Sequence, residues 1–252
     1  MLRFFRSKSP PTPSFVPDIG AGRRVYAIGD IHGRLDLFER LLDLIGQDDA
    51  GRSPLPCHLI LLGDLMDRGP HSAGVIERAM ALSAASPNVH LIKGNHEEVF
   101  VGACRGSAQY AAYCRRIGGI PALESYGLQP GAGAAMTDAD MASWMLRHVP
   151  REHVDFLDGF EDSLLMGDYL FVHAGIRPGL ALEEQEAADL RWIRGEFLQN
   201  RQLHPYMVVH GHSITDKVAE QPNRIGIDTG AWESGKLTAI GLEGTQRWFL
   251  QT

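Results

Sequence analysis

The sequence predicts an α/β fold with a polar site at the carboxyl ends of its strands. Five short apolar runs each end in a cluster of Asp, Asn, His or Gly: VYAIGDIHG (25–33), HLILLGDLMDRG (58–69), NVHLIKGNHE (88–97), YLFVHAG (169–175) and YMVVHGH (206–212). Runs of this length and composition are typical of buried strands. Because an α/β sheet places its chemistry just beyond the carboxyl ends of its strands, we expect the five clusters to converge on one site.

The first strand is expected at 25–28 and the first helix follows it. Within 34–46 the apolar residues recur at helical spacing, and Gly46 is expected to end the helix. The run 58–62 predicts a second strand.

The next helix is expected over 73–86, with Ser72 as its cap and Pro87 just beyond its end. The run 89–92 predicts a third strand. This β-α-β-α-β order predicts parallel strands joined by right-handed crossovers.

The remainder of the chain divides into a helical insertion and a return to strands. Residues 98–165 are rich in Ala, Arg and Met, with helical patterns at 110–117, 138–148 and 153–157. Strands resume at 169–172 and 206–209, and the segments 224–230, 236–244 and 246–250 predict an antiparallel hairpin meander. We therefore expect one domain over 25–252, with 98–165 as a helical cap inserted in it.

Residues 1–24 are expected to form a flexible leader, because they are basic and hold four prolines. Such a leader could dock on an acidic partner or an anionic membrane; the alternative is a solvated segment without a function. Its apolar content is too low for a signal peptide, so cytoplasm is the expected compartment.

Composition narrows the function classes. The 252 residues are 44 % apolar and 22 % charged, which is ordinary for a globular protein. The net charge of −7 argues against a nucleic-acid-binding surface, and no apolar stretch approaches the length of about 20 residues of a membrane span. The three cysteines lack metal-binding spacing. The protein is expected to be a monomer.

Six side chains at the strand ends have the chemistry of metal ligands: Asp30, His32, Asp64, Asn95, His173 and His212. Asp30 and His32 lie two residues apart, which in extended backbone places both side chains on the same side. The carboxylate of Asp64 has two oxygens and is able to bridge two cations about 3.5–4 Å apart. Each residue alone would more often be a cap or a structural histidine. A metal site is the preferred interpretation because the six residues end five strands.

Further polar side chains near the strand ends are expected to act on a phosphate. Arg68, in GDLMDRG, would clamp phosphate oxygens with its planar guanidinium group. His96 directly follows Asn95 and is expected to be a general acid toward the leaving oxygen, held cationic by Asp67.

Two assignments have open alternatives. Arg194, in LRWIRGEF, is either a second phosphate clamp or part of a solvated helix face. His210 and His212 both follow the fifth strand, and His210 either binds metal itself or orients a ligand from outside. The donor set has oxygen and nitrogen but no thiolate, which suits Mn, Fe, Mg or Zn.

These motifs resemble those of the calcineurin-like metallophosphoesterases, from about Val25 to the C-terminus. Within that superfamily the chain is similar to the bacterial branch of the PPP-type Ser/Thr protein phosphatases. The resemblance implies a four-layer αββα sandwich of two mixed sheets with a helical insertion. It assigns one metal to Asp30, His32 and Asp64, and the other to Asp64, Asn95, His173 and His212, which favours His212 over His210.

The resemblance also implies an activity. Two divalent cations, with Mn expected, would carry a bridging hydroxide that attacks the phosphorus of a phosphomonoester in line. A phosphorylated protein or peptide, modified on Ser, Thr or Tyr, is the expected substrate. The alternative is a symmetrical diadenosine tetraphosphate hydrolase. Those enzymes typically carry Ala at the position of Asp67 and GNHD in place of GNHE, and both differences favour a protein phosphatase. A catalytically inactive scaffold is a further alternative, which the intact ligand and acid positions disfavour.

Overall fold

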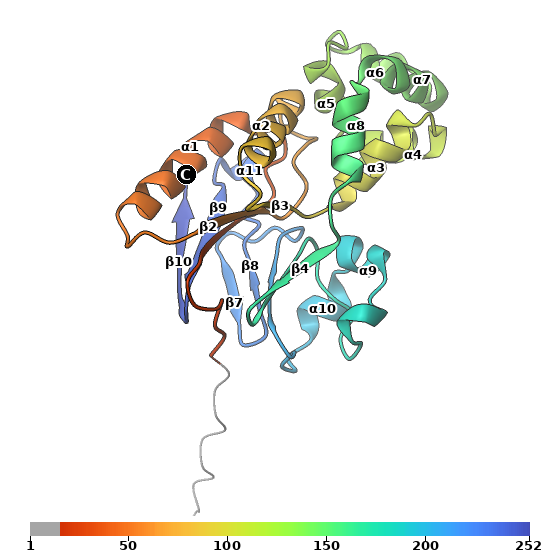
Figure 1. Cartoon of the computed structure of the whole chain (residues 1–252). Helices are drawn as coiled ribbons and strands as arrows, with labels where there is room; N and C mark the ends of the chain where they lie inside the picture. Colours follow the sequence, from red (N-terminus) through yellow and green to blue (C-terminus); the bar gives the residue numbers. More distant parts are fainter. Residues whose placement is uncertain (1–15) are drawn as a thin grey trace, which may run out of the picture.

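The computed structural model describes residues 16–252 as two stacked five-stranded sheets (Figure 1). The first sheet has the order β10-β9-β1-β2-β3. Its strands are β1 (Arg24–Ile28), β2 (Cys57–Leu61), β3 (Val89–Leu91), β9 (Thr238–Glu243) and β10 (Gln246–Gln251). β1, β2 and β3 are parallel, as the sequence predicts, and β9 and β10 extend the sheet in antiparallel pairing.

The second sheet has the order β4-β5-β6-β8-β7. Its strands are β4 (Ser163–Met166), β5 (Tyr169–Val172), β6 (Met207–His210), β7 (Ala219–Gln221) and β8 (Arg224–Gly226). The three inner strands are parallel and the two edge strands are antiparallel to their neighbours. Both sheets are therefore mixed.

The layers follow from the alternation of side chains along each strand. Val25 and Ala27 of β1 face Phe171 and Val209 of the second sheet in the core between the sheets. The other face of β1, with Tyr26, packs on α1 (Leu35–Ala50) and α2 (Ser72–Ala85).

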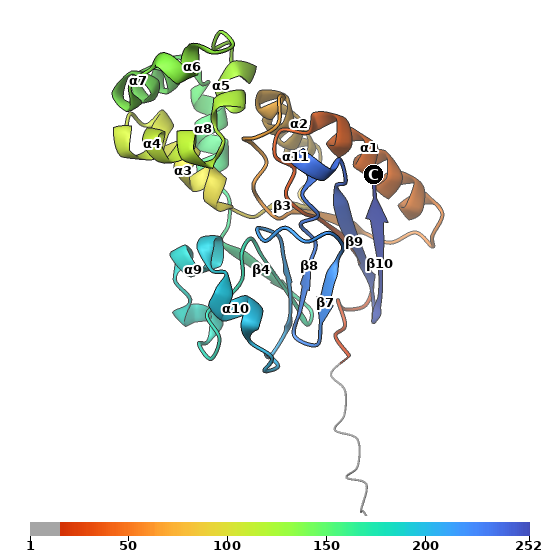
Figure 2. The same cartoon turned by 180° about the vertical axis from the view of Figure 1, so that it is seen from behind.

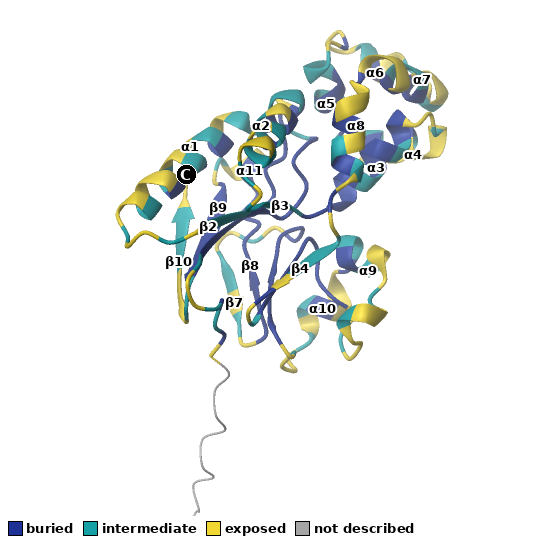
Figure 3. Ribbon diagram, in the orientation of Figure 1, coloured by how far each residue is buried: buried dark blue, intermediate teal, exposed yellow. Residues whose placement is uncertain are grey.

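On the far side, the outer face of the second sheet is covered by α9 (Ala187–Trp192) and α10 (Gly195–Gln199). A short 3-10 turn, η1 (Leu182–Glu184), precedes them. The result is a four-layer αββα sandwich, in which the strands are mostly buried and the helices keep an exposed face (Figure 3).

A helical lobe lies at one end of the sandwich (Figures 1 and 2). It contains α3 (Asn95–Cys104), α4 (Ala108–Ile117), α5 (Ile120–Ser125), α6 (Ala132–Ala135), α7 (Asp138–His148) and α8 (Arg151–Asp158). Phe100, Met145 and Leu157 of the lobe belong to the same apolar cluster as Val75 of α2. The lobe thus shares its core with the sandwich.

Two helix signals in the sequence lead to different structures. α1 continues through Gly46, which is exposed and has open space around it, so the helix ends four residues later. Ser72 is the first residue of α2 and does not cap it; its hydroxyl oxygen instead accepts a hydrogen bond of 3.0 Å from the Asp67 N–H. Ser72 therefore supports the loop that carries the site.

The two ends of the domain also differ from the sequence prediction. Only β9 and β10 form the predicted C-terminal hairpin, because β8 pairs with β6 in the other sheet. Residues 1–15 of the leader lie outside the described residues. The chain is already packed at Asp18 and Ile19: Ile19 is buried, and the Asp18 N–H donates to Asp168. Ordered packing thus begins before Val25.

Candidate metal centre

The predicted site residues share an uncommon backbone conformation. Within residues 16–252, the non-glycine residues with positive φ are His32, Asp64, Asp67, Arg68 and His212. All five are predicted site residues, and each such conformation costs about 1–3 kcal/mol. Strain of this kind persists where the surrounding fold holds a side chain in a required position. His32 therefore reaches the site through a turn with φ of 47°, and not from the extended backbone that the sequence argument assumed.

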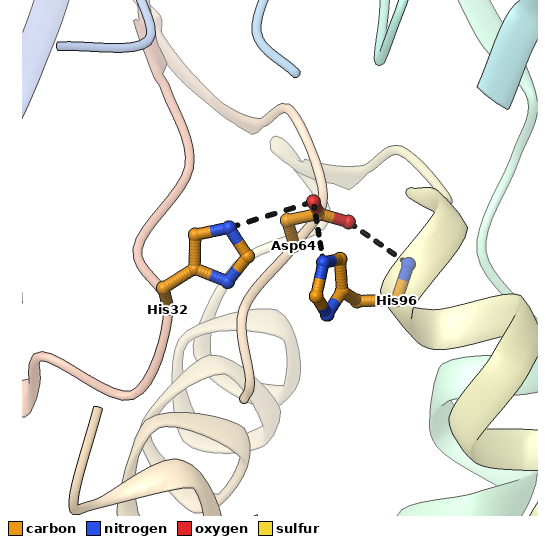
Figure 4. A group of neighbouring side chains, drawn as sticks. All are labelled: His32, Asp64 and His96. Atoms are coloured by element: carbon orange, nitrogen blue, oxygen red, sulfur yellow. Dashed lines mark hydrogen bonds and ion pairs between the residues drawn. The ribbon is translucent and has the colours of Figure 1, made fainter. Parts of the chain in front are cut away.

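Two groups of donor atoms overlap at Asp64. His32, Asp64 and His96 form one group (Figure 4), and Asp64, His173 and His212 form the other. Within each group the donor atoms lie within 4.8 Å of one another, and all five residues are buried. Because Asp64 belongs to both groups, its two carboxylate oxygens would be available to a pair of cations.

Asp30 and Asn95 complete what we call the metal-site cluster: Asp30, His32, Asp64, Asn95, His173 and His212. The Asp30 Oδ2 lies 4.0 Å from Nε2 of His32, and both Asp30 oxygens accept from the His212 N–H at 3.1 Å. The Asn95 Oδ1 lies 3.0 Å from Nε2 of His173. The structure thus brings all six predicted ligands together.

Backbone carbonyls fix the orientation of two imidazoles. The Nδ1 of His32 lies 2.8 Å from the Met66 carbonyl oxygen, and the Nδ1 of His173 lies 2.8 Å from the Leu62 carbonyl oxygen. With Nδ1–H as donor, the neutral His32 ring carries its lone pair on Nε2, which faces the site. In His173 the same hydrogen bond leaves Nε2 as the atom that would lose its proton to bind a cation. This is the arrangement in which histidine binds a metal.

Unpartnered polar atoms show that the cluster fits cations. The Nε2 atoms of His32 and His212 are buried without a hydrogen-bond partner in the described part of the chain. The Nδ1 of His212 lies only 3.2 Å from Nε2 of His173, so two imidazole nitrogens face each other. Buried polar atoms normally have partners. Divalent cations would supply them.

The charges of the cluster lead to the same conclusion. Burial, and then the charge of Asp228, raise the pKa of Asp30 well above its usual value. Burial opposes ionisation of Asp64 too, but the charges of His173 and His96 outweigh it and lower the pKa well below the usual value. For His212, burial and the charge of His173 lower the pKa to about 2, so this imidazole is neutral. Burial would lower the pKa of His173, but the charge of Asp64 raises it to about 10, so this imidazole is cationic. Crowded buried carboxylates beside imidazoles suit divalent cations.

His96 joins the cluster to Asp67 and Arg68. The Nδ1 of His96 lies 2.7 Å from Asp67 Oδ2, and its Nε2 lies 3.3 Å from Arg68 Nη2 and 3.7 Å from Asp64 Oδ2. Burial would lower the pKa of His96, but the carboxylates of Asp64 and Asp67 raise it above the usual imidazole value. The Asp67–His96 pair thus has the geometry expected of an oriented acid. Its Nε2 is also close enough to Asp64 to be counted among the possible metal donors.

The junction of α4 and α5 holds Arg68 in place. The Arg68 N–H donates to the Gly118 carbonyl oxygen at 2.8 Å, and its Nε donates to that of Ile117 at 3.5 Å. Gly118 has φ of 103°, and a Cβ there would lie 3.0 Å from Arg68 Cγ. The helical lobe therefore positions the Arg68 side chain of the sandwich.

Arg194 and His210 lie at the edge of the metal-site cluster. Arg194 is exposed at the start of α10, and its charge is among the lesser causes of the low pKa of His212. His210 is buried against Phe197, with ring centroids 5.1 Å apart, and belongs to neither donor group. The structure therefore places His212 in the cluster and His210 beside it.

Two residues that sequence reasoning did not assign also build the site. Both oxygens of the Glu97 carboxylate accept backbone N–H bonds of 2.8 Å, from Asp64 and Gly94 at one oxygen and from Leu65 at the other. Asp228 is buried, and burial raises its pKa to about 6. The segment 224–230 has the same strand-end pattern as the five runs, which was a signal for Asp228. Nothing in the sequence marked Glu97 as a support for the Asp64 loop.

Comparison with known proteins identifies the family. The profile of the calcineurin-like phosphoesterase family matches residues 23–231. The chain belongs to this family. The family uses a dinuclear metal site, and the fold and the donor groups described above agree with that assignment.

Relatives of this chain are named for different substrates. A symmetrical bis(5'-nucleosyl)-tetraphosphatase of Acidovorax ebreus (strain TPSY) is 36 % identical over 160 residues, which cover 64 % of the chain and 47 % of the relative. The match thus spans about half the length of that curated relative. The serine/threonine-protein phosphatase BSL2 of Arabidopsis thaliana is 38 % identical over 83 residues, 32 % of the chain and 8 % of the relative.

A solved structure with a provisional identification as a diadenosine tetraphosphatase has the same fold. It superposes with a TM-score of 0.63 at 19 % sequence identity, and the alignment covers 95 % of this chain and 96 % of the chain in that structure.

Among the described residues, no helix is long and apolar enough to cross a membrane.

Proposed function

We propose that this protein uses two divalent cations to hydrolyse a dinucleoside tetraphosphate, cleaving it symmetrically with one water into two nucleoside diphosphates. The observation that carries the hydrolase activity is the pair of donor groups that share Asp64. The choice of substrate is supported by the tetraphosphatase relative, which matches far more of the chain than the protein phosphatase does. This was the alternative in the sequence analysis, where a phosphoprotein substrate was preferred.

The residues of the chain have separable tasks in this proposal. Asp30, His32, Asp64, Asn95, His173 and His212 would hold the cations, for which Mn remains our expectation. Cations bound there would neutralise phosphate charge and activate water for attack on phosphorus. Arg68 binds phosphate oxygens with its guanidinium group. His96, oriented through its Nδ1 by Asp67, presents Nε2 beside Arg68 and donates a proton to the leaving oxygen.

Two sequence features favoured a protein phosphatase, namely Glu97 and Asp67, and of the two only Asp67 hydrogen-bonds to the proposed acid. The carboxylate of Glu97 accepts hydrogen bonds from backbone N–H groups of the Asp64 loop and of Gly94. The difference between GNHE and GNHD therefore concerns the support of that loop and not contact with the substrate. Asp67 does contact the acid. A serine alkoxide is a poor leaving group and needs protonation more than a departing nucleoside diphosphate does. The Asp67–His96 pair therefore favours a phosphomonoester as the second candidate substrate.

Product analysis decides between the candidates. The full-length protein with Mn²⁺ is incubated with diadenosine tetraphosphate, with a phosphoserine peptide and with p-nitrophenyl phosphate. We expect two molecules of ADP from the dinucleotide at a kcat/KM above that for the peptide. Asp64→Asn is the control for contaminating activity.

Other outcomes would contradict the proposal in distinct ways. ATP and AMP as products would exclude symmetrical cleavage. Turnover of the peptide without cleavage of the dinucleotide would overturn the first candidate and support the second. No turnover of any of the three by metal-loaded protein would leave the inactive scaffold.

A further inference from the structure

A pocket of about 640 Å³ opens beside the acid. Its walls come from the Asp64 loop, the α4–α5 region and α11 (Ala231–Ser234): Arg68, Arg116, Ile117, Gly118, Pro121 and Trp232. We call it the Trp232 pocket. These segments are far apart in the sequence, so the pocket exists only in the folded chain.

Arg68 connects the Trp232 pocket to the chemistry of the site. Its Nη2 lies 3.3 Å from Nε2 of His96, and its guanidinium carbon lies 5.4 Å from the ring centroid of Trp232. In the proposed function, His96 is the group that protonates the leaving oxygen. A leaving group whose reacting oxygen contacts His96 therefore has the Trp232 pocket next to it, on the other side of Arg68.

The lining of the pocket has the chemistry to bind a nucleotide. Trp232 is 38 % exposed, so its ring is available to a base without a change of fold. Arg68 and Arg116 supply two positive charges, and none of the lining residues is acidic. Aromatic rings bind bases by stacking, and arginine binds phosphate through its planar group.

We propose that the Trp232 pocket holds the departing nucleoside diphosphate, with its base on Trp232 and its phosphates beside Arg68 and Arg116. This inference rests on the proposed function, because it assigns one half of the dinucleotide to a defined place. It makes Trp232 a specificity-determining residue that contributes to binding of the nucleoside part and contributes little to the reaction at phosphorus.

Equilibrium binding of ADP tests this assignment without requiring turnover. Calorimetry with Mn²⁺ compares wild type, Trp232→Ala and Trp232→Phe, with ADP and with pyrophosphate, which lacks the base. We expect Trp232→Ala to weaken ADP binding about 5- to 150-fold, the range for loss of one stacked base, and Trp232→Phe to retain most of the affinity. Pyrophosphate binding should change less than about twofold in either variant.

Leu146→Ala is the matched control, because Leu146 is an exposed apolar residue of α7 outside the pocket lining. Unchanged ADP affinity in Trp232→Ala, or an equal loss for ADP and pyrophosphate, would overturn the assignment. If wild type fails to cleave diadenosine tetraphosphate while Trp232→Ala still loses ADP selectively, the proposed function fails and the pocket assignment stands.

Discussion

Among the described residues, the metal-site cluster and a second polar cluster are built in opposite ways. The metal-site cluster leaves imidazole nitrogens without partners and crowds carboxylates together. The other, which we call the Asp48 cluster, consists of Tyr26, Asp48, Arg52 and Trp248 around the end of α1. There, Asp48 Oδ2 accepts from the Tyr26 hydroxyl at 2.6 Å, from Arg52 Nε at 2.9 Å and from Trp248 Nε1 at 2.9 Å.

The difference shows which cluster serves folding and which serves ligand binding. In the Asp48 cluster no buried side-chain nitrogen or oxygen lacks a partner, and the Arg52 guanidinium lies 3.5 Å from the Trp248 ring centroid. Burial opposes ionisation of Asp48, but Arg52 and Tyr26 outweigh it and lower its pKa. A satisfied cluster stabilises the fold. A cluster with unsatisfied atoms and strained backbone costs stability, and its geometry is explained by the cations and phosphate it would bind.

The largest effect is expected at Asp64, and the proposed role of the metal-site cluster in ligand binding would be refuted if Asp64 were dispensable. Asp64→Asn removes the charge shared by both donor groups, and we expect kcat/KM to fall about 10³-fold or more, since a bound cation contributes several kcal/mol to charge stabilisation. Metal content measured by mass spectrometry should fall below two ions per chain. A variant that keeps both ions and full activity would contradict the bridging role.

His96→Asn is expected to have the next largest effect. General acids contribute about 10²- to 10⁴-fold, so kcat should fall within that range on an alkyl phosphate ester. The loss should shrink for aryl phosphates, whose leaving groups need less protonation. Equal losses on alkyl and aryl esters would show that His96 binds metal or phosphate and does not act as an acid.

Gly118→Ala tests whether the helical lobe positions Arg68. The added Cβ would lie 3.0 Å from Arg68 Cγ, and a displacement of about 1 Å in a positioning group can cost about 10²-fold in rate. We expect a loss of up to that size in kcat/KM on p-nitrophenyl phosphate. Gly127→Ala is the matched control, since Gly127 also has positive φ but nothing lies within 4 Å of its Cβ position. Similar activity losses in both variants would show that the loss comes from backbone strain at positive φ and not from displacement of Arg68.

Asp48→Asn sharpens the comparison from the opposite side. It should lower the free energy of unfolding by about 1.5–3 kcal/mol, the range for hydrogen bonds to a charged group, and leave kcat/KM unchanged. The carboxylate is only 21 % exposed, so solvent screens it weakly. Asp43→Asn, at an exposed position of the same helix, should change the unfolding free energy little. A loss of activity in Asp48→Asn would show that the Asp48 cluster also contributes to catalysis and would contradict the separation of roles between the two clusters.

The stabilisation by Asp48 should depend on pH with a definite sign. Because the folded pKa is below the unfolded value of about 3.9, the contribution is complete above that value and is lost as pH falls through the folded pKa. Chemical denaturation should therefore show the wild type losing its advantage over Asp48→Asn below about pH 4. An advantage that persists undiminished at pH 2 would contradict the charge-based account.

The sequence was most informative about the first sheet and the residues at its strand ends. Short apolar runs and their β-α-β-α-β order predict β1, β2 and β3 as parallel strands, and the helices over 138–148 and 153–157 are found close to their predicted bounds. The sequence did not show that β9 joins β1 while β8 joins β6, because strand pairing over long separations leaves no periodic signal. Nor did it show that Glu97 holds the Asp64 loop.

The sequence by itself determined the chemical inventory: which side chains end the strands, and that they are oxygen and nitrogen donors beside an arginine. The tertiary structure alone decided their geometry. It makes Asp64 common to two donor groups, turns His212 inward and His210 away, and brings Trp232 from α11 to Arg68. The physical reason is that periodicity specifies which face of a strand is buried. Convergence at a point depends on backbone turns with positive φ and on packing between segments distant in the chain, and neither is encoded locally.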